Sequence, residues 1–364
     1  MCYNLSMKKT NNNKYYDGTK LLSMKDLNGN KPEIIICTTN RTGGKSTWFG
    51  KYVVNKFLKS GEKFALLYRY NYELTDVADK FFKDIGSLFF KNKTMTGKTK
   101  ARGVYVELSL QDSDDDTGET AEVCGYAIAL NAADSIKKLS HLFSDVKRMI
   151  FDEFQSETNK YCPNEIQKFI SIHTSIARGQ GEQVRYVPVY MISNPVSIIN
   201  PYYVEMGIST RLREDTKFLK GDGFVLEQGY VDSASKAQVE SGFNRAFSSN
   251  SYVSYSAQCV YLNDSSAFIE RPPGTSTYLA TLKYNGTMFA LREFPELGII
   301  YCDDKADSSF RFKLCVTTED HNVNYVMIKR NDMFLNTLRF YFERGAFRFK
   351  DLRCKDAVLK ALSY

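Results

Sequence analysis

A short glycine-rich segment at residues 40–47, NRTGGKST, carries the residue types from which phosphate-binding loops are built. The usual pattern is glycine, four residues and then Gly-Lys-Ser or Gly-Lys-Thr. Gly44, Lys45 and Ser46 fit this pattern, whereas Thr39 occupies the position of the first glycine. The residues expected to bind a nucleotide are Asn40, Arg41, Thr42, Gly43, Gly44, Lys45, Ser46 and Thr47.

Each part of this loop has its own chemical task. Consecutive backbone N–H groups converge on phosphate oxygens, and the amino end of the following helix adds positive potential. Lys45 supplies charge at the β- and γ-phosphates, and Ser46 supplies a hydroxyl for Mg²⁺. A threonine at position 39 costs about 1–2 kcal/mol only if the backbone there must be left-handed. We therefore expect a working site whose chain enters the loop by a different path.

A second motif, RMIFDEF at residues 148–154, places two carboxylates at the end of an apolar run. A carboxylate at the tip of a strand can hold Mg²⁺, and an adjacent one can activate water. Asp152 suits the metal role and Glu153 the role of general base. The alternative is an ordinary charged turn after a strand, but the upstream glycine-rich loop favours catalysis.

Apolar periodicity predicts the elements that position these residues. Strands are expected in PEIIICTT (32–39), KFALLYRY (63–70), VKRMIFDEF (146–154) and VRYVPVYMISNP (184–195), and helices at 46–61 and 164–179. Strands that alternate with helices favour an α/β fold with a mostly parallel sheet.

Changes in composition predict three domains. Residues 1–208 are expected to form a P-loop domain, with a charged β-hairpin inserted at about 91–130. Residues 209–250, rich in glycine, serine and charge, are interpreted as a linking or lid subdomain. Residues 251–364 are expected to form a smaller α+β domain, in which Asn285-Gly286 marks a hairpin between two alternating strands.

The composition limits the class of protein. The 364 residues carry a net charge of +7, which permits a polyanionic partner without requiring one. No run approaches about eighteen apolar residues, and residues 1–30 contain no signal-peptide core, so no membrane partner is expected. The eight cysteines include no Cys-x-x-Cys pair, and several lie in apolar runs. We therefore expect a soluble intracellular protein with reduced, buried cysteines.

Three neighbouring segments are the most distinctive: IFDEF at 150–154, YCPNEI at 161–166 and ISNPVSIINPYY at 192–203. They resemble the DNA-encapsidation ATPases of phi-29-like tailed phages, which are relatives of the large terminase subunits in the ASCE class of P-loop motors. Weaker similarity runs through NRTGGKS and KFLKSGEKFALLYRYNYEL. The resemblance implies an ATP- and Mg²⁺-dependent motor that moves double-stranded viral DNA into a procapsid.

The resemblance also assigns roles to single residues. Arg41 stands where the family has an arginine within its phosphate loop. Ser193 and Asn194 match the strand-tip motif that couples hydrolysis to movement. Arg178 resembles the arginine finger that acts on the nucleotide of a neighbouring subunit, and Lys138 matches a second basic residue that acts in trans.

The expected DNA contacts lie in the basic segment at residues 91–103. The resemblance places a DNA-contacting lysine after the Arg-Tyr of residues 69–70, but Asn71 stands there. The expected contacts therefore move to Lys98, Lys100 and Arg102. The alternative is that this charged segment is merely solvated.

The tail resembles an RNase H-like nuclease that has lost its metal carboxylates. Asp264, Asp303 and Asp304 lie near expected strand ends, but a two-metal nuclease needs carboxylates that converge on ions about 4 Å apart. We expect a vestigial nuclease without cleavage activity.

By family analogy the protein forms a homo-oligomeric ring of five subunits in the host cytoplasm, attached transiently to the portal vertex of the procapsid. The analogy leaves open whether an RNA scaffold takes part. The alternative functions are another nucleic-acid ATPase of the ASCE class, such as a helicase, and a scaffold module with a silent nucleotide site.

Overall fold

The computed structural model describes residues 14–115, 117–158, 160–179, 181–198, 200–209, 211–212, 216–248, 250–258, 267–329 and 332–362. Within these residues the chain forms two compact units. The first takes the described residues of Met1–Asp152, Ile172–Asn194 and Lys217–Cys259, and the second those of Glu153–Ser171, Pro195–Thr216 and Val260–Tyr364. The chain therefore changes unit five times, first between Asp152 and Glu153.

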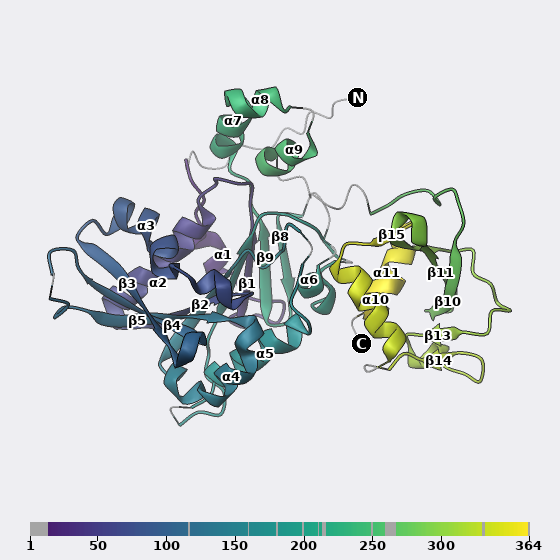
Figure 1. Ribbon diagram of the computed structural model, residues 1–364, viewed down its shortest axis with the longest axis horizontal. Helices are drawn as coiled ribbons and strands as arrows, with labels where there is room; N and C mark the ends of the chain where they lie inside the picture. The colour runs from purple at the N-terminus through teal and green to yellow at the C-terminus, as the bar shows by residue number, and fades with distance from the viewer. Residues whose placement is uncertain are drawn as a thin grey trace. The chain divides into compact units, whose positions relative to one another are not determined.

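The first unit is built on one large sheet (Figure 1). Its described strands follow the order β3-β4-β5-β2-β6-β7-β1-β9-β8. Neighbouring strands from β5 to β9 are parallel, and antiparallel strands extend both edges. The strands are β1 (Ile34–Thr38), β2 (Lys63–Tyr68), β3 (Lys93–Lys100), β4 (Tyr105–Asp112), β5 (Glu122–Ala129), β6 (Val146–Asp152), β7 (Val189–Ser193), β8 (Phe218–Gly221) and β9 (Phe224–Gln228). The predicted α/β fold with a mostly parallel sheet is confirmed.

Helices cover both faces of this sheet, as its buried central strands require. The helices are α1 (Thr19–Ser23), α2 (Lys45–Ser60), α3 (Val77–Phe89), α4 (Ala133–Lys138), the second half of α5 (Glu165–Ile176), α7 (Asp232–Glu240), α8 (Gly242–Ala246) and α9 (Ser251–Gln258). Ile35 and Cys37 of β1 pack with Phe49 and Val53 of α2 in one core. Burying each such apolar side chain contributes about 1.5–3 kcal/mol. Figure 1 shows α4 on the opposite side of the sheet from α2.

The segment 91–130 forms three antiparallel strands at one edge of the sheet, where the sequence predicts a hairpin with charged tips. The additional strand is β3, which is formed by most of the basic segment at residues 91–103. Met95 explains the difference, because its side chain is buried in the main core and its residue pairs with Leu110 of β4. The single apolar residue holds an otherwise charged strand against the sheet.

The segment 209–250 does not form a separate linking subdomain in the structure. Its residues 217–228 supply β8 and β9, and β9 pairs in parallel with β1. Val225 and Leu226 are completely buried, so this strand belongs to the core of the first unit. The small helices α7, α8 and α9 follow β9 in the chain, and α9 lies beyond the predicted domain boundary at residue 250.

The second unit contains its own sheet, with the described strands in the order β14-β13-β10-β11-β12-β15. Its elements are α6 (Pro201–Glu205), β10 (Thr277–Tyr284), β11 (Thr287–Phe294), β12 (Ile299–Asp303), β13 (Lys313–Cys315), β14 (Val326–Met327), α10 (Met333–Glu343), β15 (Phe347–Phe349) and α11 (Leu352–Leu362). Asn285 and Gly286 both have positive φ and join β10 to β11, which confirms the predicted hairpin. Leu338 of α10 and Val358 of α11 pack into the core of this sheet. The RNase H-like relationship stays a prediction.

Cysteine burial agrees with the sequence pattern. The six cysteines among the described residues are buried free thiols, and Cys2 and Cys259 lie outside those residues. Complete burial raises the pKa of Cys302 above its ordinary value, which keeps this thiol protonated. Among the helices that the structure describes, none combines the length and apolarity needed to cross a membrane.

The strand-end carboxylates of the tail form ion pairs with basic side chains. Asp303 is buried, and its Oδ2 lies 3.1 Å from Arg292 Nε. The more exposed Asp304 accepts a hydrogen bond from Lys350 Nζ at 2.5 Å, and this bond lowers the pKa of its carboxyl. Asp264 lies outside the described residues. These contacts give Asp303 and Asp304 structural roles.

Asp303→Asn is expected to lower the free energy of unfolding by about 3 kcal/mol, because it leaves the guanidinium of Arg292 without its buried carboxylate partner. Asp304→Asn, the matched control, is expected to cost much less, since solvent screens the exposed pair. Urea unfolding followed by circular dichroism measures both variants. Equal losses in the two variants would contradict the structural role of Asp303.

Candidate nucleotide-binding site

The glycine-rich loop follows β1 and leads directly into α2. Its left-handed backbone falls at Thr42 (φ 58°) and at Gly44 (φ 88°), the residue before the first turn of α2. Thr39 is not left-handed and is completely buried, with its N–H donating to the carbonyl of Ser193 at 3.3 Å. The missing first glycine therefore causes no strain. The strain of about 1–2 kcal/mol lies at Thr42 instead, and backbone strain of this kind is common at functional loops.

The side chain of Asn40 anchors the loop to the segment after β9. Its Oδ1 accepts from the N–H of Val231 at 2.9 Å, and its Nδ2 donates to the carbonyl of Val231 at 3.0 Å. The residue is completely buried. The sequence predicts Asn40 as a nucleotide contact, whereas the structure uses its amide group to fix the backbone of the loop.

Arg41 is also held by the helical segment that follows β9. Its N–H donates to the carbonyl of Ser256 at 3.0 Å, and its guanidinium lies 5.3 Å from the ring centroid of Tyr252 in α9. A cation over an aromatic ring is attracted to the electron-rich face. The sequence gives no sign of this packing, because residues 41 and 252 are far apart in the chain.

Gly43 lies where the loop is most crowded. A Cβ at this position would meet Val231 Cγ2 at 3.0 Å and the carbonyl oxygen of Asn40 at 3.2 Å. The Gly43 carbonyl accepts from the N–H of Tyr16 at 2.8 Å, and Tyr15 lies beside Gly44. The local sequence pattern does not indicate that residues 15 and 16 line the loop.

Tyr16 fixes this N-terminal segment to the sheet. Its hydroxyl donates to Glu227 Oε2 in β9 at 2.8 Å. Burial raises the pKa of Tyr16 far above its ordinary value, and burial also raises the pKa of Glu227. The tyrosine therefore stays a neutral donor, and the segment at residues 14–16 is held across the loop.

Lys45 and Asn194 form the central polar contact of the site. Lys45 is only 8% exposed, and its Nζ donates to Asn194 Oδ1 at 2.7 Å. Asn194 follows β7, the strand between β1 and β6. The structure thus brings together the loop lysine and the strand-tip asparagine, which belong to two separate motifs of the sequence. Ser193 Oγ, one residue earlier, is buried and has no hydrogen-bond partner among the described residues.

The carboxylate motif lies at the same edge of the sheet. Asp152 ends β6 and pairs with Ile192 of β7, while Thr38 at the end of β1 pairs with Ser193. The carboxyl ends of the three strands are therefore level. Glu153, the next residue in the chain, is exposed and has a φ of 54°, so the backbone turns sharply after the strand.

Arg178 and Lys138 lie near one another at a surface of the first unit. Arg178 follows α5, and its guanidinium donates to Ser140 Oγ at 2.7 Å. Lys138 is exposed at the end of α4, two residues before Ser140. The structure therefore brings together the two basic residues for which a trans role was predicted.

The three predicted DNA contacts lie along the edge of the sheet. Lys98 and Lys100 belong to β3, and Arg102 lies in the turn that follows, with a φ of 57°. Lys100 Nζ pairs with Glu107 Oε1 at 3.0 Å, and Glu107 is also opposite Lys98 in the strand register. One carboxylate therefore reduces the positive charge of this edge.

Comparison with known proteins links this chain to one family. The family described as Podovirus DNA encapsidation protein (Gp16) matches residues 10–362. The DNA packaging protein of Bacillus phage phi29 is 27% identical over 325 residues, which cover 88% of this chain and 89% of that protein.

Solved structures with the same fold include two packaging motors. The bacteriophage phi-29 viral genome packaging motor assembly aligns with a TM-score of 0.52 at 24% identity, over 94% of this chain and 97% of that chain. The phi-28 DNA packaging motor aligns with a TM-score of 0.54 at 15% identity, over 97% and 99% of the two chains. These structures show a shared fold, and the family match over nearly the whole length shows that the chain belongs to the Podovirus DNA encapsidation protein (Gp16) family.

Proposed function

We propose that this protein hydrolyses ATP and uses the free energy to move double-stranded viral DNA into a procapsid. The observation that carries the proposal is the bond between Lys45 Nζ and Asn194 Oδ1, which joins the phosphate loop to the tip of β7. Membership of the encapsidation family and the 27% identity to a phage DNA packaging protein support the same function.

The residues of the loop fit a nucleotide phosphate with Mg²⁺. A side chain at Gly43 would crowd Val231 and the carbonyl of Asn40, Lys45 supplies an ammonium, and α2 directs its amino end toward the loop. Ser46 and Asp152 offer the oxygen ligands that Mg²⁺ prefers. When bound, the ion neutralises charge that develops on the transferred phosphoryl group. Glu153 would accept the proton of the attacking water.

The Lys45–Asn194 bond suggests how nucleotide binding reaches the sheet. A phosphate oxygen attracts an ammonium more strongly than the neutral amide oxygen of Asn194 does, so a bound nucleotide would compete with Asn194 for Lys45. Arrival of ATP would therefore release the tip of β7, and departure of phosphate would restore the bond. This exchange gives Asn194, and Ser193 beside it, the coupling role that the family resemblance implies.

Subunits of this protein are proposed to work as a ring on the portal vertex of the procapsid in the host cytoplasm. The ring is required because an arginine finger in trans needs a neighbouring subunit, and five subunits follow the family analogy. Contacts to DNA would be made mainly to phosphates, since a packaging motor must accept every sequence.

Glu153→Gln should retain ATP binding but lower the rate of hydrolysis at least about 100-fold, because only the activation of water is lost. Lys45→Ala is the contrasting variant and should lose binding itself. Binding of a fluorescent ATP analogue and release of phosphate are measured separately. Normal hydrolysis by Glu153→Gln would place the general base elsewhere.

Arg178→Ala and Glu153→Gln should each be nearly inactive alone and recover part of the ATPase activity when mixed under ring-forming conditions. Some interfaces of a mixed ring pair a normal base with a normal arginine, and such an arginine contributes about 10³–10⁵ in rate. Ser140→Ala is the matched control, since it removes the hydrogen-bond partner of Arg178 but keeps the arginine. If no mixing ratio restores activity, Arg178 does not act in trans.

Replacing Lys98, Lys100 and Arg102 with glutamine should weaken duplex binding about equally for all sequences. The slope of log K, the logarithm of the DNA-binding constant, against log salt concentration should also become less steep. The slope changes by roughly one for each DNA phosphate that the variant no longer neutralises. The control replaces Lys217 and Lys220, which lie at the opposite edge of the same sheet. Fluorescence anisotropy at several salt concentrations measures the slope. An unchanged slope would show that these three residues of the β3 edge do not contact DNA.

A further inference from the structure

A cavity of about 370 Å³ opens at the amino ends of β1, β6 and β7, whereas the phosphate loop follows the carboxyl end of β1. Pro32 lies just before β1, Pro188 just before β7, and Arg148 near the start of β6. The volume of the cavity lies in the range of small-molecule sites, about 300–1,000 Å³. The cavity is therefore separate from the phosphate loop and large enough for a ligand.

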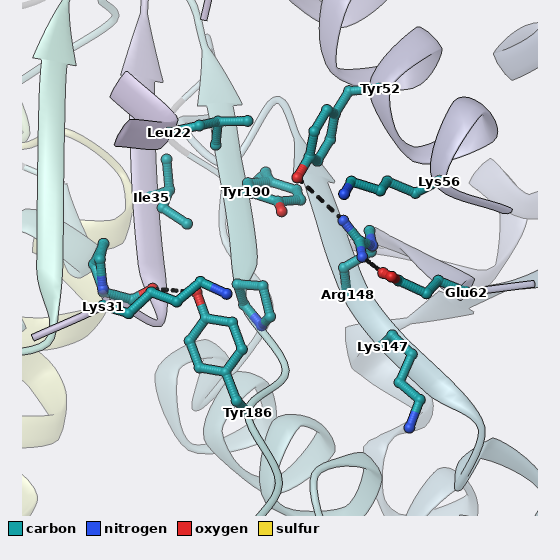
Figure 2. A pocket seen from close by; sticks show the side chains of 12 residues that line it. Leu22, Lys31, Ile35, Tyr52, Lys56, Glu62, Lys147, Arg148, Tyr186 and Tyr190 are labelled. Carbon is teal, nitrogen blue, oxygen red and sulfur yellow. Dashed lines mark hydrogen bonds and ion pairs between the residues drawn. The ribbon is translucent and has the colours of Figure 1, made fainter. Parts of the chain in front are cut away.

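The cavity combines cationic and aromatic side chains. Four cationic residues and one carboxylate, Glu62, line it together with three tyrosines. Figure 2 shows Lys31 and Tyr186 on one side of the cavity and Tyr52, Lys56 and Arg148 on the other. This lining has an excess of positive charge beside aromatic surfaces.

Arg148 is a fixed, buried part of this lining. It is 7% exposed, forms an ion pair with Glu62, and donates from Nη1 to the hydroxyl of Tyr52 at 3.3 Å (Figure 2). Its Nε is buried and has no hydrogen-bond partner among the described residues. The contacts with Glu62 and Tyr52 hold the guanidinium in one position at the wall of the cavity.

The tyrosine on the opposite side is also held in place. The hydroxyl of Tyr186 donates to the carbonyl of Pro32 at 2.8 Å, and the ammonium of Lys31 lies 4.1 Å from its ring centroid. Burial raises the pKa of Tyr186 to about 12, which keeps it neutral, yet the side chain is 37% exposed. A planar ligand group therefore meets an aromatic ring that is already oriented.

We propose that this cavity binds a nucleotide unit, with its base against Tyr52 or Tyr186 and its phosphate beside Lys31 and Lys56. Aromatic rings accept any base by stacking, and lysines bind phosphate as point charges. An acidic peptide would use the charge but not the accessible rings of Tyr52 and Tyr186. The unit is either a free nucleotide or one residue of a single strand, and the two sources share this chemistry.

The test uses full-length protein carrying Lys45→Ala, so that the phosphate loop does not bind the probe. The probes are AMP and a ten-nucleotide single-stranded oligonucleotide containing 5-iodouracil. Binding is measured by calorimetry or anisotropy, and the position of the strand by photo-crosslinking and mass spectrometry. Saturable AMP binding identifies the ligand as a free nucleotide. A crosslink to the peptides that contain Tyr52 or Tyr186, without AMP binding, identifies the ligand as single-stranded nucleic acid.

Lys31→Ala combined with Lys56→Ala should weaken the binding that is observed at least about fivefold. Lys59→Ala is the matched control, because this exposed lysine lies on the same helix α2 but does not line the cavity. Tyr186→Phe should retain binding and Tyr186→Leu should lose it, since the ring is the proposed contact. Absence of both AMP binding and a crosslink in this cavity, or equal effects of the double variant and Lys59→Ala, overturns the proposal whatever the ATPase activity.

Discussion

The site depends on how the buried ammonium of Lys45 is satisfied. A charge removed from water needs a partner, and the partner here is the side-chain oxygen of Asn194. This contact is possible because β7 lies between β1 and β6, so its tip is beside the loop. The order of three strands therefore determines which polar group can hold the lysine and respond when a phosphate competes for it.

The loop around this lysine is held by contacts that are distant in sequence. Asn40 bonds to Val231, Arg41 to Ser256 and Gly43 to Tyr16, so three separate segments fix its backbone. Such anchoring compensates for the left-handed conformation of Thr42. A preorganised loop loses less entropy when it binds phosphate, which increases affinity without further contacts.

The two ends of the parallel strands have different chemistry. At the carboxyl ends, backbone N–H groups and a single lysine form a site for phosphate, with carboxylates to hold a metal. At the amino ends, three tyrosines line a cavity together with Arg148 and three lysines. In the second unit, by contrast, Asp303 is neutralised by a cation of the protein itself.

The local sequence pattern determined the strands that precede the loop and the carboxylates, the helix α2, and the hairpin at Asn285-Gly286, because these depend on short-range periodicity and turn preference. Only the tertiary structure decided that β9 joins β1 and that the charged strand β3 forms an edge. It also decided that the side-chain amide of Asn40 bonds to Val231 and anchors the loop. These features rest on pairing and burial between distant segments, and a local pattern does not specify the partner of a strand or of a buried amide.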